Sequence, residues 1–507
     1  PSFAEIQYWD SELNSGNRNI SDVAIAIAQS AQNEDAEILD AKVAAANQFT
    51  AAVQADADAN AAYRGESGEA FGRAFLDQID SSDDELTDEQ VQAQVEAFGD
   101  GETNIPGIPG EMGEIFTFTN QSDNLVGTDA DDTFRGPNGN TLQTVDSVDG
   151  GGGFDTLNAL RTGGNITPVL VGVERINISA TADSTLNLSD STGVEEVFAS
   201  DQYGTGGRLI VTGIDSSVTI GLRDTTAGGA PLAVQADFTD AAGSGDTANV
   251  ELISADAGSL VVVGGMETVN VNTSGGSSFQ LADAELETVN VTGSGALTLD
   301  IFAGSEANLE SVNASGLNGG VTFTETVEND FEFIGGSGDD VISIGGATNE
   351  DFVIDTGAGN DDIYVGTATG ETNITGGAGA DAIQLFTSED TLVYNAQSDS
   401  TFTNFDSITG FDVTEDQFDF SALNLTGEED IIAANTTATT LGELAGGVTD
   451  LFSDGTDDYA VAYLQTGGDD FLLVDANNDG NFTSAADLVI NVTGTDASTF
   501  TSANFTF

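Results

Sequence analysis

The first part of the chain has apolar positions at helical spacing. This spacing continues, in an alanine-rich context, through residues 21–98. Thr87 and Gln90 have the spacing of a capping box, which predicts that a last helix begins there and ends at Gly99. The pattern therefore predicts a small N-terminal α-helical domain over residues 1–100.

The helical pattern stops at residues 101–114, a segment that contains two of the six prolines and is typical of a linker. After it, short β-branched runs alternate with clusters of Gly, Asn, Asp and Ser, as in an all-β array. We expect three parts in this array: stacked strands at 115–330, a glycine- and aspartate-rich part at 331–390, and a C-terminal β region at 391–507.

A repeat of about 20 residues is visible in the stacked strands. An apolar residue, Glu, any residue and a β-branched residue follow one another at 173–176, 194–197, 266–269, 286–289 and 309–312. A unit this short cannot bury its apolar face alone, so it must stack on its neighbours. The fold class predicted is mainly β, a parallel β-solenoid with a C-terminal β cap, and the repeated glutamates are expected to face solvent.

Glycine-aspartate turns precede three strands in residues 331–390. The pattern Gly-Gly-x-Gly-x-Asp-x-Ile occurs three times, once with Thr356 in the first glycine position. The three aspartates are 21 and 20 residues apart, which matches the solenoid period, so the turns are expected to stack on one edge. The candidate metal ligands in them are Gly336, Gly338, Asp340, Gly357, Gly359, Asp361, Gly377, Gly379 and Asp381.

Calcium explains the composition of these turns. Ca²⁺ takes six to eight oxygen ligands at about 2.3–2.6 Å, and turn carbonyls together with carboxylates supply them. Glycine allows positive φ, which lets the carbonyls turn toward one point. Polar turn residues explain a single copy, but they do not explain three copies in register. We expect Ca²⁺ between successive turns, with the Ile after each Asp pointing into the core.

Two further candidate calcium sites have weaker patterns. One is a pair of turns after the linker, a degraded copy at 127–134 and a full copy at 150–157. The other begins like an EF-hand loop but has Ala486 at the twelfth position, where Glu is usual, and a hairpin turn is the alternative. The candidate ligands are Asp132, Gly151, Gly153 and Asp155 in the first, and Asp475, Asn477, Asp479 and Asp487 in the second.

The charge of the chain excludes several classes of partner. Acidic residues number 86 and basic residues 9, for a net charge of -77, and the last basic residue is Arg223. This charge argues against nucleic acid and anionic membranes as partners. Without Cys or His there are no disulfides, no thiolate or imidazole metal ligands and no histidine base. No apolar run approaches the ~20 residues that span a bilayer.

The glycine-aspartate turns resemble the nonapeptide repeats of RTX proteins, which pass through type I secretion systems and fold outside the cell as calcium-bound parallel β-rolls. Residues 405–423 resemble the segment that follows the roll in that family, and residues 497–507 resemble its uncleaved secretion signal. Within RTX proteins, the chain is similar to the S-layer proteins of Caulobacter-like bacteria. Unlike the family, it has lost the aspartates of the opposite edge, at 345–350 and 366–371.

The resemblance implies a calcium-dependent structural protein that self-assembles into a surface lattice or filament on a Gram-negative bacterium. It also implies the type I secretion apparatus as a partner. The N-terminal domain is then expected either to anchor the layer, with lipopolysaccharide as the candidate ligand, or to serve in oligomerisation. An adhesin that binds glycans or host surfaces through the solenoid faces is the alternative. A polysaccharide-modifying enzyme is disfavoured, because the solenoid beyond Arg223 has no basic residue to neutralise an acidic sugar.

Overall fold

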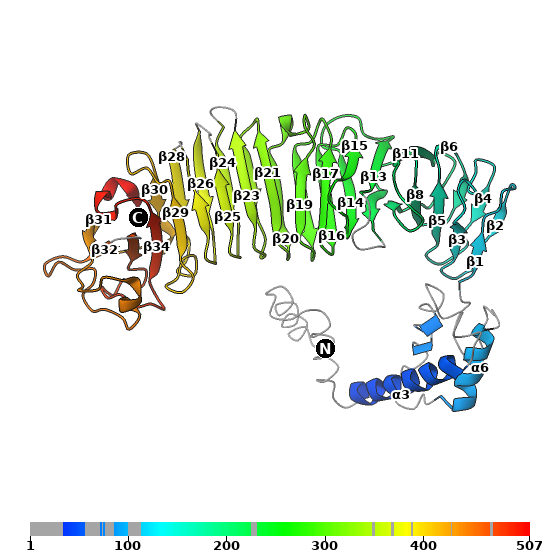
Figure 1. Cartoon of the computed structure of the whole chain (residues 1–507), viewed down its shortest axis with the longest axis horizontal. Helices are drawn as coiled ribbons and strands as arrows, with labels where there is room; N and C mark the ends of the chain where they lie inside the picture. Colours follow the sequence, from blue (N-terminus) through cyan, green and yellow to red (C-terminus); the bar gives the residue numbers. More distant parts are fainter. Residues whose placement is uncertain are drawn as a thin grey trace. The chain divides into compact units, whose positions relative to one another are not determined.

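The computed structural model confirms the mainly β fold: the residues that it describes include 44% strand, two helices and a β-solenoid of about 13 turns. Figure 1 shows the labelled strands of this solenoid. It describes residues 34–55, 71–72, 75–76, 86–99 and 113–507, apart from 225–230, 347–349, 367–369, 387–388, 427 and 467–469. Among the described residues, no helix combines the length and apolarity that a membrane span requires. The expected linker at 101–114 lies almost entirely outside the described residues.

The N-terminal helical region contains α3 (Glu34–Ala55) and α6 (Asp88–Gly99). The capping box is confirmed: the Thr87 backbone N–H donates to Gln90 Oε1 at 2.9 Å, and the Gln90 N–H donates to Thr87 Oγ1 at 3.3 Å. The two helices share one apolar core, which consists of Ala45, Phe49, Val53, Phe71, Phe75, Val91, Val95 and Phe98. Within this core, the ring of Phe49 contacts those of Phe71 and Phe75, and the ring of Phe71 stacks on that of Phe98.

The chain divides into two compact units, and the first contains residues 1–226 and 232–239. Its strands belong to three parallel sheets. Sheet A consists of β1 (Ile115–Thr117), β3 (Thr133–Gly136), β5 (Thr156–Arg161), β8 (Arg175–Ala180), β10 (Glu196–Ser200) and β12 (Thr219–Arg223). Sheet B consists of β2 (Asn124–Val126), β4 (Ser147–Asp149) and β7 (Val169–Val171), and sheet C of β6 (Gly164–Ile166), β9 (Ser184–Asn187), β11 (Arg208–Ile214) and β13 (Ala233–Phe238).

The second unit contains residues 227–231 and 240–507, and its coils have two sides. Sheet D consists of β14 (Thr247–Ile253), β16 (Thr268–Ser274), β18 (Thr288–Gly293), β20 (Ser311–Leu317), β22 (Phe331–Ile334), β24 (Phe352–Asp355), β26 (Glu371–Thr375), β28 (Glu389–Val393), β30 (Gln417–Asp419) and β35 (Phe505–Thr506). Sheet E consists of β15 (Ser259–Val263), β17 (Ser277–Ala282), β19 (Leu297–Ile301), β21 (Val321–Val327), β23 (Val341–Gly346), β25 (Asp362–Val365), β27 (Ala382–Gln384), β29 (Asp406–Thr409), β34 (Leu488–Thr493), β33 (Asp470–Val474), β32 (Tyr459–Gln465) and β31 (Glu428–Ala433).

Strand alternation and the 20-residue repeat produce the core of the solenoid. Val269 pairs with Val289 and Val289 with Val312, so that one apolar residue per coil forms a continuous buried column. The repeated glutamates beside this column do not all face solvent. Glu267 is buried, because its carboxylate accepts hydrogen bonds from the backbone N–H groups of Gly245 and Asp246 in the preceding coil, whereas Glu195, Glu287 and Glu310 are exposed as predicted.

The C-terminal cap ends the solenoid with strands of opposite direction. β34 is parallel to β29, but β33 is antiparallel to β34, and β32 is antiparallel to β33. The cap has its own apolar core, which includes Phe452, Phe471 and Phe482. It covers the edge of β29, which would otherwise present unpaired backbone groups to another chain.

Candidate metal centre

The three C-terminal glycine-aspartate turns lie on one edge of the second unit, as expected. They connect β22 to β23, β24 to β25 and β26 to β27, each time from sheet D to sheet E. Asp340, Asp361 and Asp381 are each at most 1% exposed. The isoleucine two residues after each aspartate is also buried, which confirms that it ties the turn to the core.

The carboxylates of these turns form a hydrogen-bonded column. Asp361 Oδ1 accepts a hydrogen bond from the backbone N–H of Asp340 at 2.7 Å. Asp381 Oδ1 accepts in the same way from Asp361 at 2.9 Å. Asp340 Oδ1 begins the column by accepting from the backbone N–H of Val321. Each aspartate therefore joins its own coil to the preceding one.

In two of these carboxylates the other oxygen lacks a partner. The Oδ2 atoms of Asp361 and Asp381 are buried and have no hydrogen-bond partner among the described residues. The same is true of Asp155 Oδ2 in the first unit, whereas Asp340 Oδ2 accepts from the backbone N–H of Gly336 at 3.4 Å. An unpaired buried acceptor costs about 1–3 kcal/mol, and more when it carries charge. These oxygens are therefore available to a cation.

The segment that carries this column supplies no basic side chain, because the chain has no Lys, Arg or His after Arg223. Burial is the largest influence on these groups, and neighbouring carboxylates act in the same direction. Together they raise the pKa of Asp340 and Asp381 to about 7 and that of Asp361 to about 6. A cation between the turns would remove this penalty.

Only some of the glycines in these turns have the positive φ that favours glycine. Gly357, Gly359 and Gly377 have φ of 87°, 149° and 80°. Gly336, Gly338 and Gly379 do not have positive φ, and they are required instead because a Cβ atom would collide with the backbone of the adjacent coil. For these three positions the expectation of positive φ was wrong, and close packing of coils explains the glycine.

The donor set fits Ca²⁺ in its chemistry but not as a carboxylate cage. Among the described residues, no group of three acidic side chains is arranged to hold a metal ion. A calcium ion here would therefore depend on backbone carbonyls as well as on the unpaired carboxylate oxygens. The carbonyl oxygens of Gly336 and Gly357 accept hydrogen bonds from the following coil, and each retains a second lone pair.

The first unit contains a second carboxylate column of the same kind. Asp155 Oδ1 accepts from the backbone N–H of Asp132 at 2.7 Å, and Glu174 Oε2 accepts from that of Asp155 at 2.7 Å. Burial raises the pKa of Asp155 to about 7. Gly151 and Gly153 have φ of 96° and 98°. The structure thus brings Asp132 and Asp155 together and adds Glu174, which sequence reasoning had counted among the solvent-facing glutamates.

The loop that begins at Asp475 connects β33 to β34 and is flanked by strands, so it is not a helix-loop-helix EF-hand. Asp475 accepts hydrogen bonds from the backbone N–H groups of Asp479 and Gly480, and Asn477 Oδ1 also accepts from Asp479. Asp487 is buried, and its Oδ1 has no hydrogen-bond partner among the described residues. Burial raises the pKa of Asp487 to about 7, with a contribution from Asp475.

The structure extends the column of the second unit by one residue that sequence reasoning missed. Asp406 Oδ1 accepts from the backbone N–H of Asp381 at 3.0 Å. The Asp406 N–H donates to Ser400 Oγ, which donates to the carbonyl oxygen of Val489 in the cap. The turn before Asp406 has no glycine, and the spacing is 25 residues. The sequence did contain one signal for Asp406, because Asp406 and Ile408 repeat the Asp-x-Ile spacing of the three turns.

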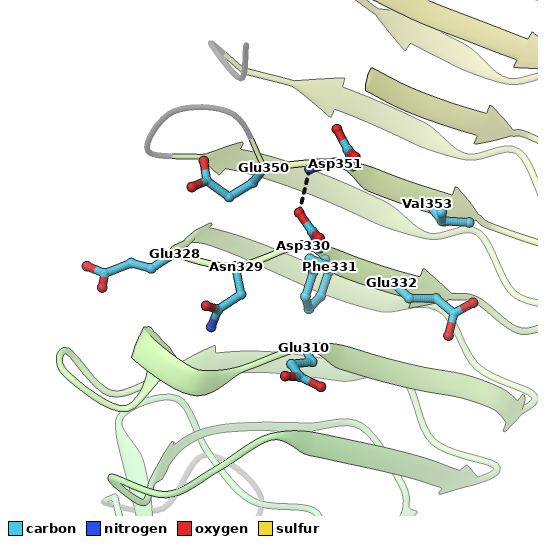
Figure 2. A pocket seen from close by; sticks show the side chains of 9 residues that line it. All are labelled: Glu310, Glu328, Asn329, Asp330, Phe331, Glu332, Glu350, Asp351 and Val353. Carbon is cyan, nitrogen blue, oxygen red and sulfur yellow. Dashed lines mark hydrogen bonds between the residues drawn. The ribbon is translucent and has the colours of Figure 1, made fainter. Parts of the chain in front are cut away.

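The opposite edge is also acidic, although the aspartates were expected to be lost there. A groove of about 680 Å³ lies there, and acidic side chains from three successive coils line it (Figure 2). Asp330 Oδ1 accepts from the backbone N–H of Asp351 at 3.0 Å, and Asp351 Oδ1 accepts from that of Glu371 at 2.9 Å. Unlike the glycine-aspartate edge, Asp330 and Asp351 are exposed, so water solvates them. The lining residues are Glu310, Glu328, Asn329, Asp330, Phe331, Glu332, Glu350, Asp351 and Val353.

Comparisons with known proteins assign no family to this chain. No family model matches it, and a search of curated proteins finds no significant relative. The functional argument therefore depends on the geometry and charge of the chain's own residues.

Proposed function

We propose that the protein is an extracellular, calcium-dependent structural protein that assembles into a surface layer on a Gram-negative cell. One observation carries the proposal. A column of buried carboxylates with unpaired oxygens lies in a segment that contains no basic residue. Such a column stabilises the fold only when something other than the protein neutralises it.

Calcium would supply hard positive charge between the coils. Where calcium is scarce, as in the cytosol, Asp340, Asp361 and Asp381 repel one another and keep the segment open for export. At about tenfold excess over the dissociation constant, each site stabilises the folded state by about 1.4 kcal/mol. Two sites between three turns would contribute about 3 kcal/mol, a large fraction of a typical domain's stability.

The solenoid also suits repetitive assembly. Stacked coils form an extended, regular surface, and the cap protects one exposed strand edge, so growth by uncontrolled strand pairing is blocked there. The N-terminal helical region is proposed as the anchor, with lipopolysaccharide as its ligand, and the type I apparatus as the export route.

A calcium titration of the full chain tests the proposal. We expect that added calcium increases the far-ultraviolet circular dichroism signal of β structure, and that electron microscopy then shows an ordered sheet or filament. The chelator EDTA is expected to reverse both. An unchanged spectrum after chelation would exclude calcium-dependent folding, whereas calcium-dependent folding without ordered particles would exclude the assembly alone.

A further inference from the structure

A groove of about 610 Å³ on the outer face of sheet E is not explained by calcium binding or by assembly. It crosses β17, β19, β21, β23 and β25, which follow one another in the sheet (Figure 1). We propose that this groove binds a linear, neutral polysaccharide. The inference goes beyond the proposed function and does not depend on assembly.

The floor of the groove presents one side chain from each of five successive coils. On adjacent strands, Gln280 is paired with Asp300, Thr324 with Ser343, and Ser343 with Tyr364. With strands about 4.8 Å apart, the four intervals span about 19 Å. This length accommodates several pyranose rings in a row, so the repeat of the solenoid suits a repeating ligand.

Aromatic rings at the groove provide the apolar contact that a sugar needs. Tyr364 is 40% exposed, and its ring packs against Phe386, which is 38% exposed, with the ring centroids 4.9 Å apart. Phe302, on the groove wall, is 46% exposed. The partly positive C–H groups of a pyranose face pack against the negative face of an aromatic ring. Among the described residues, Phe302, Tyr364 and Phe386 are the exposed aromatic side chains.

Polar groups around the rings match sugar hydroxyls. Asp300 Oδ2 accepts from Gln280 Nε2 at 2.7 Å, which fixes both side chains on the floor. Glu325 Oε1 accepts from the backbone N–H of Ile301 at 2.6 Å, which fixes the carboxyl at the wall. Its burial, with Asp300 and Glu306 nearby, raises the pKa of Glu325 to about 7. A group that holds its proton near neutral pH can donate to a hydroxyl as well as accept from one.

Charge selects the class of ligand. Phosphate, sulfate and uronic acids need a cationic partner, and no basic residue follows Arg223. A neutral saccharide needs no cationic partner, since its hydroxyls pair with carboxylates, amides and the Tyr364 hydroxyl. A concave site with a few fixed polar groups is typical of small-ligand recognition.

The test uses the full chain in millimolar calcium and isothermal titration with neutral linear hexasaccharides of glucose, mannose and galactose, and with hexagalacturonate. We expect at least one neutral chain to bind and hexagalacturonate not to bind. Tyr364→Ala should weaken binding about threefold to tenfold, whereas Tyr364→Phe, which keeps the ring, should change it less. Asp300→Asn should also weaken binding.

Two variants outside the groove control for general effects. Val353→Ala removes an exposed apolar side chain on sheet D, and Glu310→Gln removes an exposed carboxylate there, and both should bind as the parent does. Circular dichroism in calcium confirms that each variant is folded. The proposal is overturned if none of the neutral hexasaccharides binds, if hexagalacturonate binds more tightly, or if the groove variants and the controls lose affinity equally.

Discussion

At the residue scale, Asp361 of the glycine-aspartate edge uses its two carboxylate oxygens differently. Oδ1 of Asp361 accepts the backbone N–H of Asp340, which is a structural role that does not require a cation. Oδ2 of Asp361 has no partner among the described residues. A substitution that keeps one oxygen and removes the charge therefore separates coil-to-coil hydrogen bonding from cation binding.

Asp361→Asn keeps an acceptor oxygen for the Asp340 N–H and removes the negative charge. In EDTA we expect its free energy of unfolding to equal or exceed that of the parent, because a buried charge is lost. In calcium we expect the calcium-induced stabilisation to fall by about 1.4 kcal/mol for each site lost at tenfold excess. Urea unfolding with and without calcium measures both quantities.

Asp361→Ala serves as the comparison, because it removes the acceptor as well and leaves the Asp340 N–H unpaired. It should cost about 1–3 kcal/mol in EDTA as well as in calcium. Glu371→Gln, at an exposed position on the opposite edge, is the control and should change neither. If Asp361→Asn responds to calcium as fully as the parent does, Asp361 is not a calcium ligand.

At the element scale, the turns need glycine where two coils approach closely. Gly379→Ala would place a Cβ atom against the carbonyl oxygen of Gly359 without any demand on φ, so it should destabilise the fold by about 1–3 kcal/mol. Gly276→Ala is the matched control, because nothing lies within 4 Å of its Cβ and its φ is not positive. It should be neutral or stabilising by up to about 1 kcal/mol. Thermal unfolding of both variants measures this, and equal losses would contradict the close-approach explanation.

The sequence predicted those elements whose signal is local. The capping box at Thr87 and Gln90 depends on residues three apart, and it is confirmed. The column of the second unit was found where glycine marks the turn, but Asp406 was missed because its turn is longer and has no glycine. The antiparallel order of the cap depends on contacts between distant segments, which no local pattern encodes.

At the scale of the whole molecule, the net charge of -77 has two components with different physics. Exposed carboxylates, such as those of the acidic groove in Figure 2, are solvated, and salt screens their repulsion over a few ångströms at high ionic strength. Buried carboxylates, such as Asp340 and Asp381, are screened much less. Halophilic adaptation would account for the first component, whereas under the proposed function a cation held at a fixed place neutralises the second.

This difference gives a prediction for the intact protein. In EDTA, molar sodium chloride should raise the melting temperature only partly, because it screens the exposed charges alone. Millimolar calcium in low salt should raise it further, because the buried columns are neutralised as well. Magnesium at the same concentration is the control, and it should be less effective, since Mg²⁺ demands near-ideal octahedral geometry and gives up its water reluctantly. Differential scanning calorimetry in the three solutions measures the melting temperatures. If sodium chloride or magnesium raises the melting temperature as much as calcium does, general charge screening explains the stabilisation. The glycine-aspartate edge is then a set of polar turns stabilised by their own hydrogen bonds.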